Sequence, residues 1–280
     1  MLQNTCLLVN LKISMPPQTK LAREASDDVE LKYQTAKKQG RVTKQLFHPN
    51  DIKPLTQIMS RARTVFNELS LPYDSAYRII PSASYFTFLE KMNPISGEFD
   101  QKKADFLRSY DEVVRKSRLA LGGLFNEDDY PSEERLQNTI GFLIESSVVP
   151  AVTAFDTLAG VTPDMIEELK QQAIEGQDEK IKIAMADLLG RLHVSLNKAK
   201  AKLSVGDAIF RDSLVSNIHD ALEAIDNLNL TNDPKIVEIA AEVRNTLHGI
   251  TPKAIRDDKG LREVVVADTE ALLNKVSEFF

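Results

Sequence analysis

The sequence predicts a mainly α-helical protein: a helical bundle with a long antiparallel helical hairpin and a small β element. Apolar residues recur at steps of three and four through two successive segments between Thr162 and Leu228, which places them on one side of a helix. A short break at residues 204–207 separates the segments, so we expect the second helix to pack antiparallel against the first. Near the N-terminus, apolar residues alternate with other residues from Leu7 to Ile13, which predicts a strand.

Each of the two long segments supplies its own apolar stripe. The first stripe is formed by Met185, Leu188, Leu192, Leu196, Ala199 and Leu203, and the second by Phe210, Leu214, Ile218, Ala221, Ile225 and Leu228. Thr162, Asp233 and Thr251 each precede a proline, an order that suits an N-cap followed by the first residue of a helix. Gly176 lies inside the first segment, and the pattern leaves open whether it interrupts the helix or is carried on an exposed face.

An amphipathic helix is expected early in the N-terminal half. Leu21, Ala25, Val29 and Tyr33 recur at four-residue steps and predict one apolar face, with the helix ending at Gly40.

The remaining N-terminal segments mix helix and strand patterns. Helices are expected from about 52 to 69 and from 99 to 121. Residues 71–92 form an irregular region rich in aromatic residues and proline, in which Tyr77–Ile80 is a candidate strand beside the N-terminal one. Residues 143–155 hold β-branched residues around a proline, which suits an edge strand. The small β element therefore combines the N-terminal strand with strands from the middle of the chain.

The domain organisation follows from this division. We expect an N-terminal α+β region over residues 1–155 and a C-terminal helical bundle over 156–280, with the boundary near 154–161. A single continuous domain is the alternative.

Composition narrows the class of protein. The chain of 280 residues is long enough to bury a hydrophobic core that needs no stabilising cross-link. Its single cysteine, Cys6, cannot form an intramolecular disulfide, which fits a reducing compartment. The net charge of −6 argues against a protein whose whole surface binds nucleic acid or an anionic membrane. The apolar N-terminal run is too short and too polar for a signal peptide or membrane span, so we expect a cytoplasmic protein without membrane association.

The sequence contains no motif typical of an enzyme active site. The four histidines, His48, His193, His219 and His248, are far apart and lack zinc-site spacing, and there is no second cysteine. Neither a phosphate-binding glycine-rich loop nor a nucleophile elbow is present. We therefore expect no catalytic residues, no metal site and no cofactor.

The region 71–92 is the best candidate for a protein-binding surface. Tyr73, Asp74, Tyr77, Arg78 and Tyr85 lie there, and exposed tyrosine and arginine side chains often supply most of the energy of an interface. The alternative is a buried loop that closes the end of a helical core.

The basic residues Lys37, Lys38, Arg41 and Lys44 make the most basic part of the chain and are the candidate polyanion site. Lys102, Lys103, Arg115 and Arg118 are further candidates for phosphate contacts. A solvated helix face is the simpler interpretation of such a run.

Five motifs resemble, in the same order, the hallmarks of a bacteriophage protein family of unknown function, over nearly the whole chain. They are Leu-Leu-Val-Asn-Leu at 7–11, Leu-Pro-Tyr-Asp at 71–74, Arg-Ile-Ile-Pro-Ser-Ala-Ser-Tyr-Phe at 78–86, Phe-Arg-Asp-Ser-Leu-Val-Ser-Asn-Ile at 210–218 and Asn-Leu-Asn-Leu-Thr-Asn-Asp-Pro at 227–234. Members of that family are often encoded beside a MoxR-type AAA ATPase and a protein with a von Willebrand factor A domain. The resemblance implies an adaptor of an ATPase machine that acts in the host cytoplasm, and it supplies no catalytic residues.

Three functions remain as hypotheses. The first is a non-enzymatic phage interaction or adaptor protein with a protein partner, such as the AAA ATPase. The second is a nucleic-acid-binding accessory protein of phage replication. The third is a self-assembling structural or host-defence-inhibiting protein, a homo-oligomer whose apolar stripes extend across a subunit interface.

Overall fold

The computed structural model describes residues 2–205, 213–248 and 251–279. Its contacts divide the chain into two compact units, and neither is a continuous stretch of sequence. Unit 1 comprises residues 1–10, 67–88 and 146–280, and unit 2 comprises 11–66 and 89–145. The units are thus interleaved, whereas the sequence analysis placed one boundary near 154–161.

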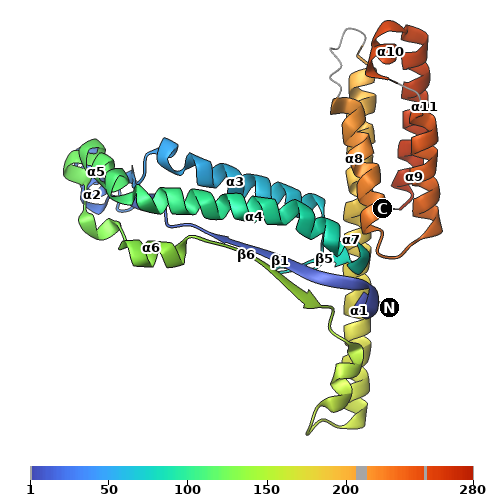
Figure 1. The fold of residues 1–280 in the computed structure, drawn as a ribbon, viewed down its shortest axis with the longest axis horizontal. Coiled ribbons are helices and arrows are strands. Elements are labelled where there is room, and N and C mark those ends of the chain that lie inside the picture. Colours follow the sequence, from blue (N-terminus) through green and yellow to red (C-terminus); the bar gives the residue numbers. More distant parts are fainter. Residues whose placement is uncertain (1, 206–212, 249–250, 280) are drawn as a thin grey trace. The chain divides into compact units, whose positions relative to one another are not determined.

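A bundle of helices forms most of unit 1 and confirms the mainly α-helical prediction. It consists of α7 (Pro163–Leu203), α8 (Ser213–Leu228), α9 (Pro234–Leu247) and α11 (Lys259–Ser277), with the short α10 (Pro252–Asp257) beside α11 (Figure 1). Helix α7 packs against α8 and α11, while α9 packs against the same two helices. Leu188, Leu192 and Leu196 are fully buried, so the apolar stripe expected for the first segment is the core-facing side of α7.

The expected helical hairpin is present in the described residues. The colours of Figure 1 show α8 returning alongside the C-terminal half of α7, so the two helices are antiparallel. Ile218, Ala221 and Ile225 of α8 are buried, as the second stripe predicted. Residues 206 and 207 of the expected break, and Phe210, lie outside the described residues.

The three predicted N-caps are confirmed. The side chains of Thr162, Asp233 and Thr251 accept hydrogen bonds from the backbone N–H groups of Met165, Lys235 and Ala254, at 3.4, 2.9 and 3.1 Å. Gly176 does not interrupt α7, which continues through it with that position exposed.

The small β element is a four-stranded sheet with the order β4-β5-β1-β6. The strands are β1 (Cys6–Ser14), β4 (Leu71–Pro72), β5 (Arg78–Pro81) and β6 (Gly141–Val148). Antiparallel pairing of β1 with β5 places Leu8 opposite Ile79, two side chains that are both buried. The strands predicted around Leu7–Ile13 and Tyr77–Ile80 are confirmed. The edge position of β6 is confirmed as well, although a 3-10 helix, η4 (Val152–Thr157), replaces the expected end of that strand.

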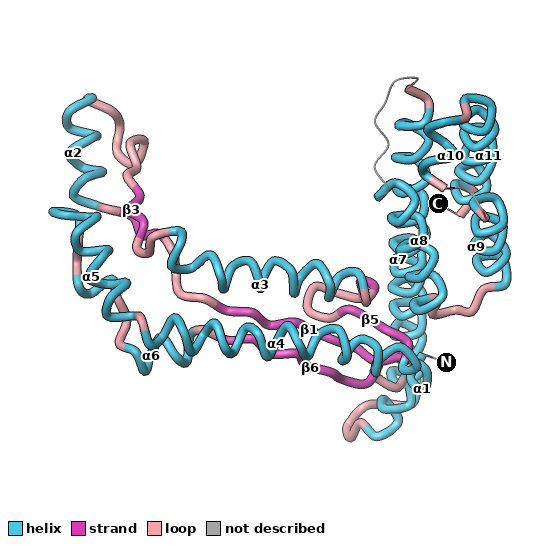
Figure 2. Tube along the Cα trace, turned by 45° about the horizontal axis from the view of Figure 1, so that its top comes forward, coloured by secondary structure: helices cyan, strands magenta, loops and turns pink. Residues whose placement is uncertain are grey.

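Unit 2 contains most of α3 (Pro49–Glu68) and α4 (Tyr85–Arg108), together with α5 (Tyr110–Leu121) and α6 (Glu133–Thr139). A small hairpin of β2 (Thr19–Leu21) and β3 (Thr43–Gln45) flanks α2 (Arg23–Tyr33). Figure 2 shows α2 at the same end of this unit as α5. The ring of Phe47 lies edge-on to Phe106 at 6.0 Å and to Tyr130 at 5.9 Å between centroids, so aromatic packing holds this end together.

Two helix boundaries differ from the sequence prediction. Helix α4 begins at Tyr85 and continues through Pro94, so residues 85–92 are helical and the expected start at 99 was wrong. Phe88 and Met92 are fully buried, and this apolar packing offsets the hydrogen bond that a proline inside a helix removes. Helix α2 ends at Tyr33 because Gln34 is left-handed, with φ of 52°. The expected continuation to Gly40 was therefore wrong.

Candidate functional site

Tyr73, Asp74 and Tyr77 of the predicted interaction loop lie in a tight hairpin turn between β4 and β5. Asp74 organises the turn: its Oδ1 accepts hydrogen bonds from the N–H groups of Ala76 and Tyr77 at 2.8 and 2.7 Å. The N–H of Asp74 in turn donates to the carbonyl of Tyr77 at 3.0 Å. An aspartate that bonds to the backbone two and three residues ahead favours such turns. Asp74 is exposed, yet its carboxylate is engaged in the hydrogen bonds that stabilise the turn.

Tyr73 packs into unit 1 and is only 9% exposed. The ammonium group of Lys180, on α7, lies 4.3 Å from the centre of its ring, a cation–π contact. Burial and the charge of Asp74 together raise the pKa of Tyr73. This tyrosine joins the hairpin to α7 and presents little surface to a partner.

Arg78 is also held inside unit 1. Its Nε donates to Ser70 Oγ and its Nη2 to the Ser70 carbonyl, both at 2.8 Å. Arg191, from α7, donates to the same carbonyl at 2.7 Å and to the carbonyls of Asn67 and Glu68 at 2.9 and 2.8 Å. Those carbonyls end a helix and lack partners within it. The two guanidinium groups therefore satisfy a helix C-terminus, and no sequence pattern indicates this role of Arg191.

Tyr85, the fifth predicted residue, marks a more open surface. Its hydroxyl lies 2.8 Å from Ser146 Oγ, which joins the first turn of α4 to the end of β6. Phe86 follows Tyr85 on α4 and Val148 lies two residues after Ser146 on β6, and their side chains are 70% and 66% exposed. Because residues two apart on a strand share a face, Val148 lies on the same side of β6 as Ser146. We call Tyr85, Phe86, Ser146 and Val148 the Phe86–Val148 patch.

Hydrogen bonds within unit 1 hold the segment before this patch. Ser84 Oγ donates to the carbonyl of Asn227, at the end of α8, at 2.6 Å. Ser82 Oγ donates to the carbonyl of Thr5, the last residue of α1 (Leu2–Thr5), at 3.0 Å. Both serines belong to the 3-10 turn η1 (Ser82–Ser84) that leads into α4. The patch is therefore presented by a fixed backbone.

The predicted polyanion site is only partly exposed. Lys37, Lys38 and Arg41 lie at the surface, but Lys44 is 9% exposed and its ammonium group donates to the carbonyl of Leu124 at 2.6 Å. Its charge is also neutralised by Asp129, whose Oδ2 lies 2.6 Å away. Lys44 thus contributes to the packing of unit 2 and is not available to phosphates.

Three of the four further basic candidates already have acidic partners. Lys102 pairs with Asp105, Arg115 with Glu112, and Arg118 with Glu127. Lys103 is half-buried. Pairs of this kind on exposed helix surfaces are worth little, but they lower the positive potential that a nucleic acid would meet.

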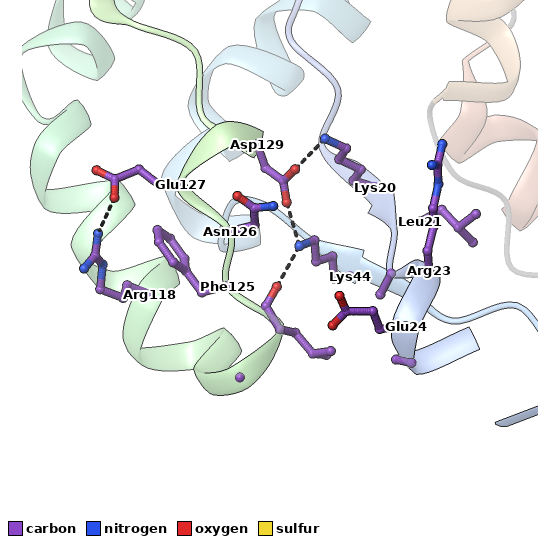
Figure 3. A pocket seen from close by; sticks show the side chains of 14 residues that line it. Lys20, Leu21, Arg23, Glu24, Lys44, Arg118, Phe125, Asn126, Glu127 and Asp129 are labelled. Carbon is purple, nitrogen blue, oxygen red and sulfur yellow. Dashed lines mark hydrogen bonds and ion pairs between the residues drawn. The ribbon is translucent and has the colours of Figure 1, made fainter. Parts of the chain in front are cut away.

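A pocket of about 740 Å³ lies in unit 2 between the start of α2 and the turn that follows α5 (Figure 3). Its polar centre is Asp129, at the end of the 3-10 turn η3 (Glu127–Asp129). The ammonium groups of Lys20 and Lys44 both reach the carboxylate. Burial opposes ionisation of Asp129, but the hydrogen bonds from the two lysines outweigh it and hold the pKa of Asp129 below its ordinary value.

The remaining charges of the pocket also neutralise one another. Arg118 lies 4.7 Å from the centre of the Phe125 ring and pairs with Glu127 at 3.3 Å. Within the described part of the chain, no group of three or more metal-ligating side chains comes together. The pocket is best explained as a structural ion-pair cluster that ties the β2–β3 hairpin to the turn after α5.

A protein-family model matches residues 3–266 of the chain. The chain belongs to the DUF3150 family of proteins of unknown function. No curated protein and no solved structure matches the chain. The DUF3150 match spans residues of both units, so the described architecture is that of the family region itself. Among the described residues of this DUF3150 protein, no helix has the length and apolar character needed to cross a bilayer.

Proposed function

We propose that this DUF3150 protein is a non-enzymatic interaction protein that binds a protein partner through the Phe86–Val148 patch. The observation that carries the proposal is the exposure of Phe86 and Val148, 70% and 66%, in the two segments that the Tyr85–Ser146 contact joins. Exposed apolar patches are typical of protein-binding sites.

The rigid support of the patch favours this role. Ser82 and Ser84 fix the turn before α4 through hydrogen bonds to backbone carbonyls, so little freedom is lost when a partner binds. The patch retains Tyr85 from the predicted interaction loop. Tyr73 and Arg78 move to a supporting role, since their side chains are used inside unit 1.

The resemblance to phage proteins supplies the proposed partner. In this proposal the chain is phage-encoded, acts in the host cytoplasm, and serves as the adaptor of a MoxR-type AAA ATPase and a von Willebrand factor A domain protein. An adaptor needs a preformed binding surface and no reactive group of its own, which agrees with the mutual neutralisation of charge in the unit 2 pocket.

Co-purification with the neighbouring ATPase tests the proposal. We expect Phe86→Ala with Val148→Ser to reduce capture of the ATPase at least about ten-fold, since central apolar contacts carry most of an interface's energy. Leu119→Ala is the control, because Leu119 of α5 is also a strongly exposed apolar residue but lies in unit 2. Arg78→Ala is unsuitable, because it also removes the hydrogen bonds that hold Arg78 to Ser70 inside unit 1.

Two results would contradict the proposal. Undiminished capture by the double variant would exclude the patch as the binding site. Failure of the wild-type chain to capture the ATPase would exclude the adaptor role.

Binding of nucleic acid is the second candidate, favoured by the exposure of Lys37, Lys38 and Arg41. A gel-shift series at two salt concentrations distinguishes it, because phosphate contacts weaken steeply with added salt. Loss of a shift in Lys37→Glu/Lys38→Glu, with no shift change in Arg115→Glu, would support this function in place of the adaptor.

A further inference from the structure

Residues 19–45 form a small body at one end of unit 2, built from β2, α2 and β3. The β2–β3 ladder joins the first three residues of this segment to the last three. Ser26 Oγ, on the helix, accepts a hydrogen bond from the N–H of Val42 at 3.0 Å, and the N–H of Ala22 donates to the carbonyl of Val42 at 2.9 Å. These bonds tie the helix and the hairpin to each other, and we call residues 19–45 the α2 flap.

The α2 flap is held to the rest of unit 2 at one place. Lys20 and Lys44 both form ion pairs with the carboxylate of Asp129. The Lys44 ammonium group also donates to the carbonyl of Leu124 at 2.6 Å. Among the described residues, every hydrogen bond and ion pair between the flap and the rest of unit 2 is one of these. Both acceptors belong to the turn that follows α5, at residues 122–129.

Apolar packing adds little to this attachment. Of the residues in the α2 flap, only Ala22, Ser26 and Lys44 are buried, and Ala22 alone is apolar. Burial of a single methyl group stabilises an attachment far less than burial of a leucine or phenylalanine side chain. The flap is therefore held on unit 2 mainly by the charges that meet at Asp129.

The chain is firmly fixed just outside the flap. The N–H of Leu46 donates to the carbonyl of Gln18 at 2.8 Å, which closes the base of the hairpin. The carbonyl of Leu46 accepts hydrogen bonds from Ser117 Oγ and the Tyr130 hydroxyl, both at 2.8 Å. Leu46 and Phe47 are only 3% and 1% exposed. A weakly held flap thus begins at a well-anchored base, which is the arrangement of a hinge.

We propose that the α2 flap is a hinged lid on the pocket of unit 2, with the carboxylate of Asp129 as its latch. The flap supplies one wall of the pocket, from residues 20–25 and Lys44, and the turn at 123–129 supplies the opposite wall (Figure 3). Rotation of the flap about its base at Gln18 and Leu46 separates the two walls and opens the pocket. Segments with few buried apolar contacts are the ones that open while the rest of a protein stays folded.

The burial of Lys44 explains why Asp129 decides between the closed and open positions. The side chains of Lys44 and Asp129 are only 8% and 3% exposed while they pair. A buried charge that loses its partner is strongly unfavourable. Without the Asp129 carboxylate, the closed position would keep the Lys44 ammonium group away from water with a single carbonyl as its partner. Lifting of β3 carries that group into water, so loss of the latch favours the open position.

The other charges that line the pocket do not replace the latch. Arg23 and Glu24 belong to the flap and move with it. Glu127 lies on the turn, but it pairs with Arg118 of α5 at 3.3 Å, on the same side of the hinge. Among the described residues that line the pocket, Asp129 is therefore the carboxylate that joins the two walls.

Distances between two spin labels, measured by pulsed electron paramagnetic resonance, test the hinge in the full-length chain. The flap pair joins Leu31→Cys, near the end of α2, to Leu119→Cys on α5, at positions that are 80% and 81% exposed. The control pair joins Leu119→Cys to Lys53→Cys, an exposed position on α3, so both of its labels lie outside the flap. Cys6→Ala removes the native thiol from both pairs.

We expect one narrow distance distribution for each pair while Asp129 is present. In Asp129→Asn, which keeps the size of the side chain but not its charge, the flap pair should gain a second population. The ratio of open to closed molecules should rise at least about ten-fold, because a buried ion pair loses one partner, and the control pair should not change. Asp129→Glu retains the anion and should stay closed. Glu127→Gln is the matched control, since it removes a carboxylate from the same turn without touching the latch, and it should stay closed as well.

Three results would overturn the inference. An unchanged flap pair in Asp129→Asn would exclude the latch. A second population in both pairs would show that the substitution loosens unit 2 as a whole, so that the cluster supports the fold and no lid exists. Equal opening in Glu127→Gln would show that Asp129 has no special role. ATPase capture through the Phe86–Val148 patch is measured separately and does not depend on these outcomes.

Discussion

Arg78 and Arg191 donate to one carbonyl oxygen, that of Ser70, at 2.8 and 2.7 Å. They come from β5 and from α7, and both also reach the carbonyl of Asn67. Asp187, one turn before Arg191, accepts from its guanidinium group at 2.8 Å and orients it. Two cations at a helix C-terminus oppose its partial negative charge and fasten the β4–β5 hairpin to the bundle.

Replacing Arg191 should therefore lower the stability of unit 1. Arg191→Lys keeps the charge but cannot span several carbonyls, since an ammonium lacks the planar fork of donors. We expect both Arg191→Lys and Arg191→Ala to lower the free energy of unfolding, the alanine variant by about 1–3 kcal/mol. Urea unfolding followed by circular dichroism measures the change. Arg115→Ala, which breaks an exposed pair on α5, is the control and should shift it by less than about 0.5 kcal/mol. Equal effects of the two alanine variants would contradict the assigned role.

The Lys20–Asp129–Lys44 cluster should make stability depend on acid pH. Because the two lysines hold the pKa of Asp129 below its ordinary value, the ionised carboxylate is favoured in the folded state. This contribution is complete above the pKa of the unfolded chain, about 4, and is lost as pH falls through the lower folded pKa. The stability difference between the wild-type chain and Asp129→Asn should thus shrink as pH falls from about 6 to about 3. A difference that stayed constant across this range would show that Asp129 is not the group involved.

Sequence periodicity predicted the helices of unit 1 well because their apolar side chains pack against one another. Leu192 and Ile225 repeat at helical steps and are buried as predicted. The same logic failed for the helix expected around α2: Leu21, which lies in β2, and Tyr33 share the predicted inner face but are exposed. Spacing shows which residues a helix can bury together, whereas the presence of a covering element depends on the rest of the fold.

The helix expected to start at 99 begins at Tyr85 instead. Pro81, in the region interpreted as irregular, ends β5, and Pro94 lies within α4. The sequence around Pro94 does not reveal that Phe88 and Met92 on the preceding turns are buried deeply enough to keep the helix together.

The candidate sites were harder to predict because they depend on contacts between distant parts of the chain. Lys44 was grouped with Lys37 and Lys38 by its position in the sequence. Its ammonium group, however, pairs with Asp129 and donates a hydrogen bond to the carbonyl of Leu124. An arginine that binds backbone carbonyls, as Arg191 does, has no sequence signal at all. Val148 belonged to a predicted strand, and its proximity to Tyr85 follows only from the contact with Ser146.

Tyr110 should ionise unusually late and make the protein sensitive to alkali. Burial, followed by the influence of Tyr130 and Asp111, raises its pKa to about 12, and its hydroxyl donates to the carbonyl of Pro131 at 2.9 Å. A raised folded pKa favours the protonated form, so the contribution is complete below the unfolded pKa of about 10 and is lost as pH rises towards 12. Ultraviolet titration should show a tyrosine that ionises near pH 12 and is missing in Tyr110→Phe. If the late ionisation persisted in that variant, it would belong to another tyrosine.

Gly176 should be replaceable with a gain in stability. It lies within α7 at an exposed position, its φ is not in the left-handed region, and a Cβ atom added there would meet nothing within 4 Å. Alanine loses less backbone freedom than glycine on entering a helix, so Gly176→Ala should raise the free energy of unfolding by about 0.5–1 kcal/mol. Gly40→Ala is the contrasting variant, because its Cβ would lie 2.9 Å from Val29 Cγ1 on α2 and should lower stability instead. Thermal unfolding of the two variants beside the wild-type chain measures both signs, and destabilisation by Gly176→Ala would mean that α7 bends or opens at this position.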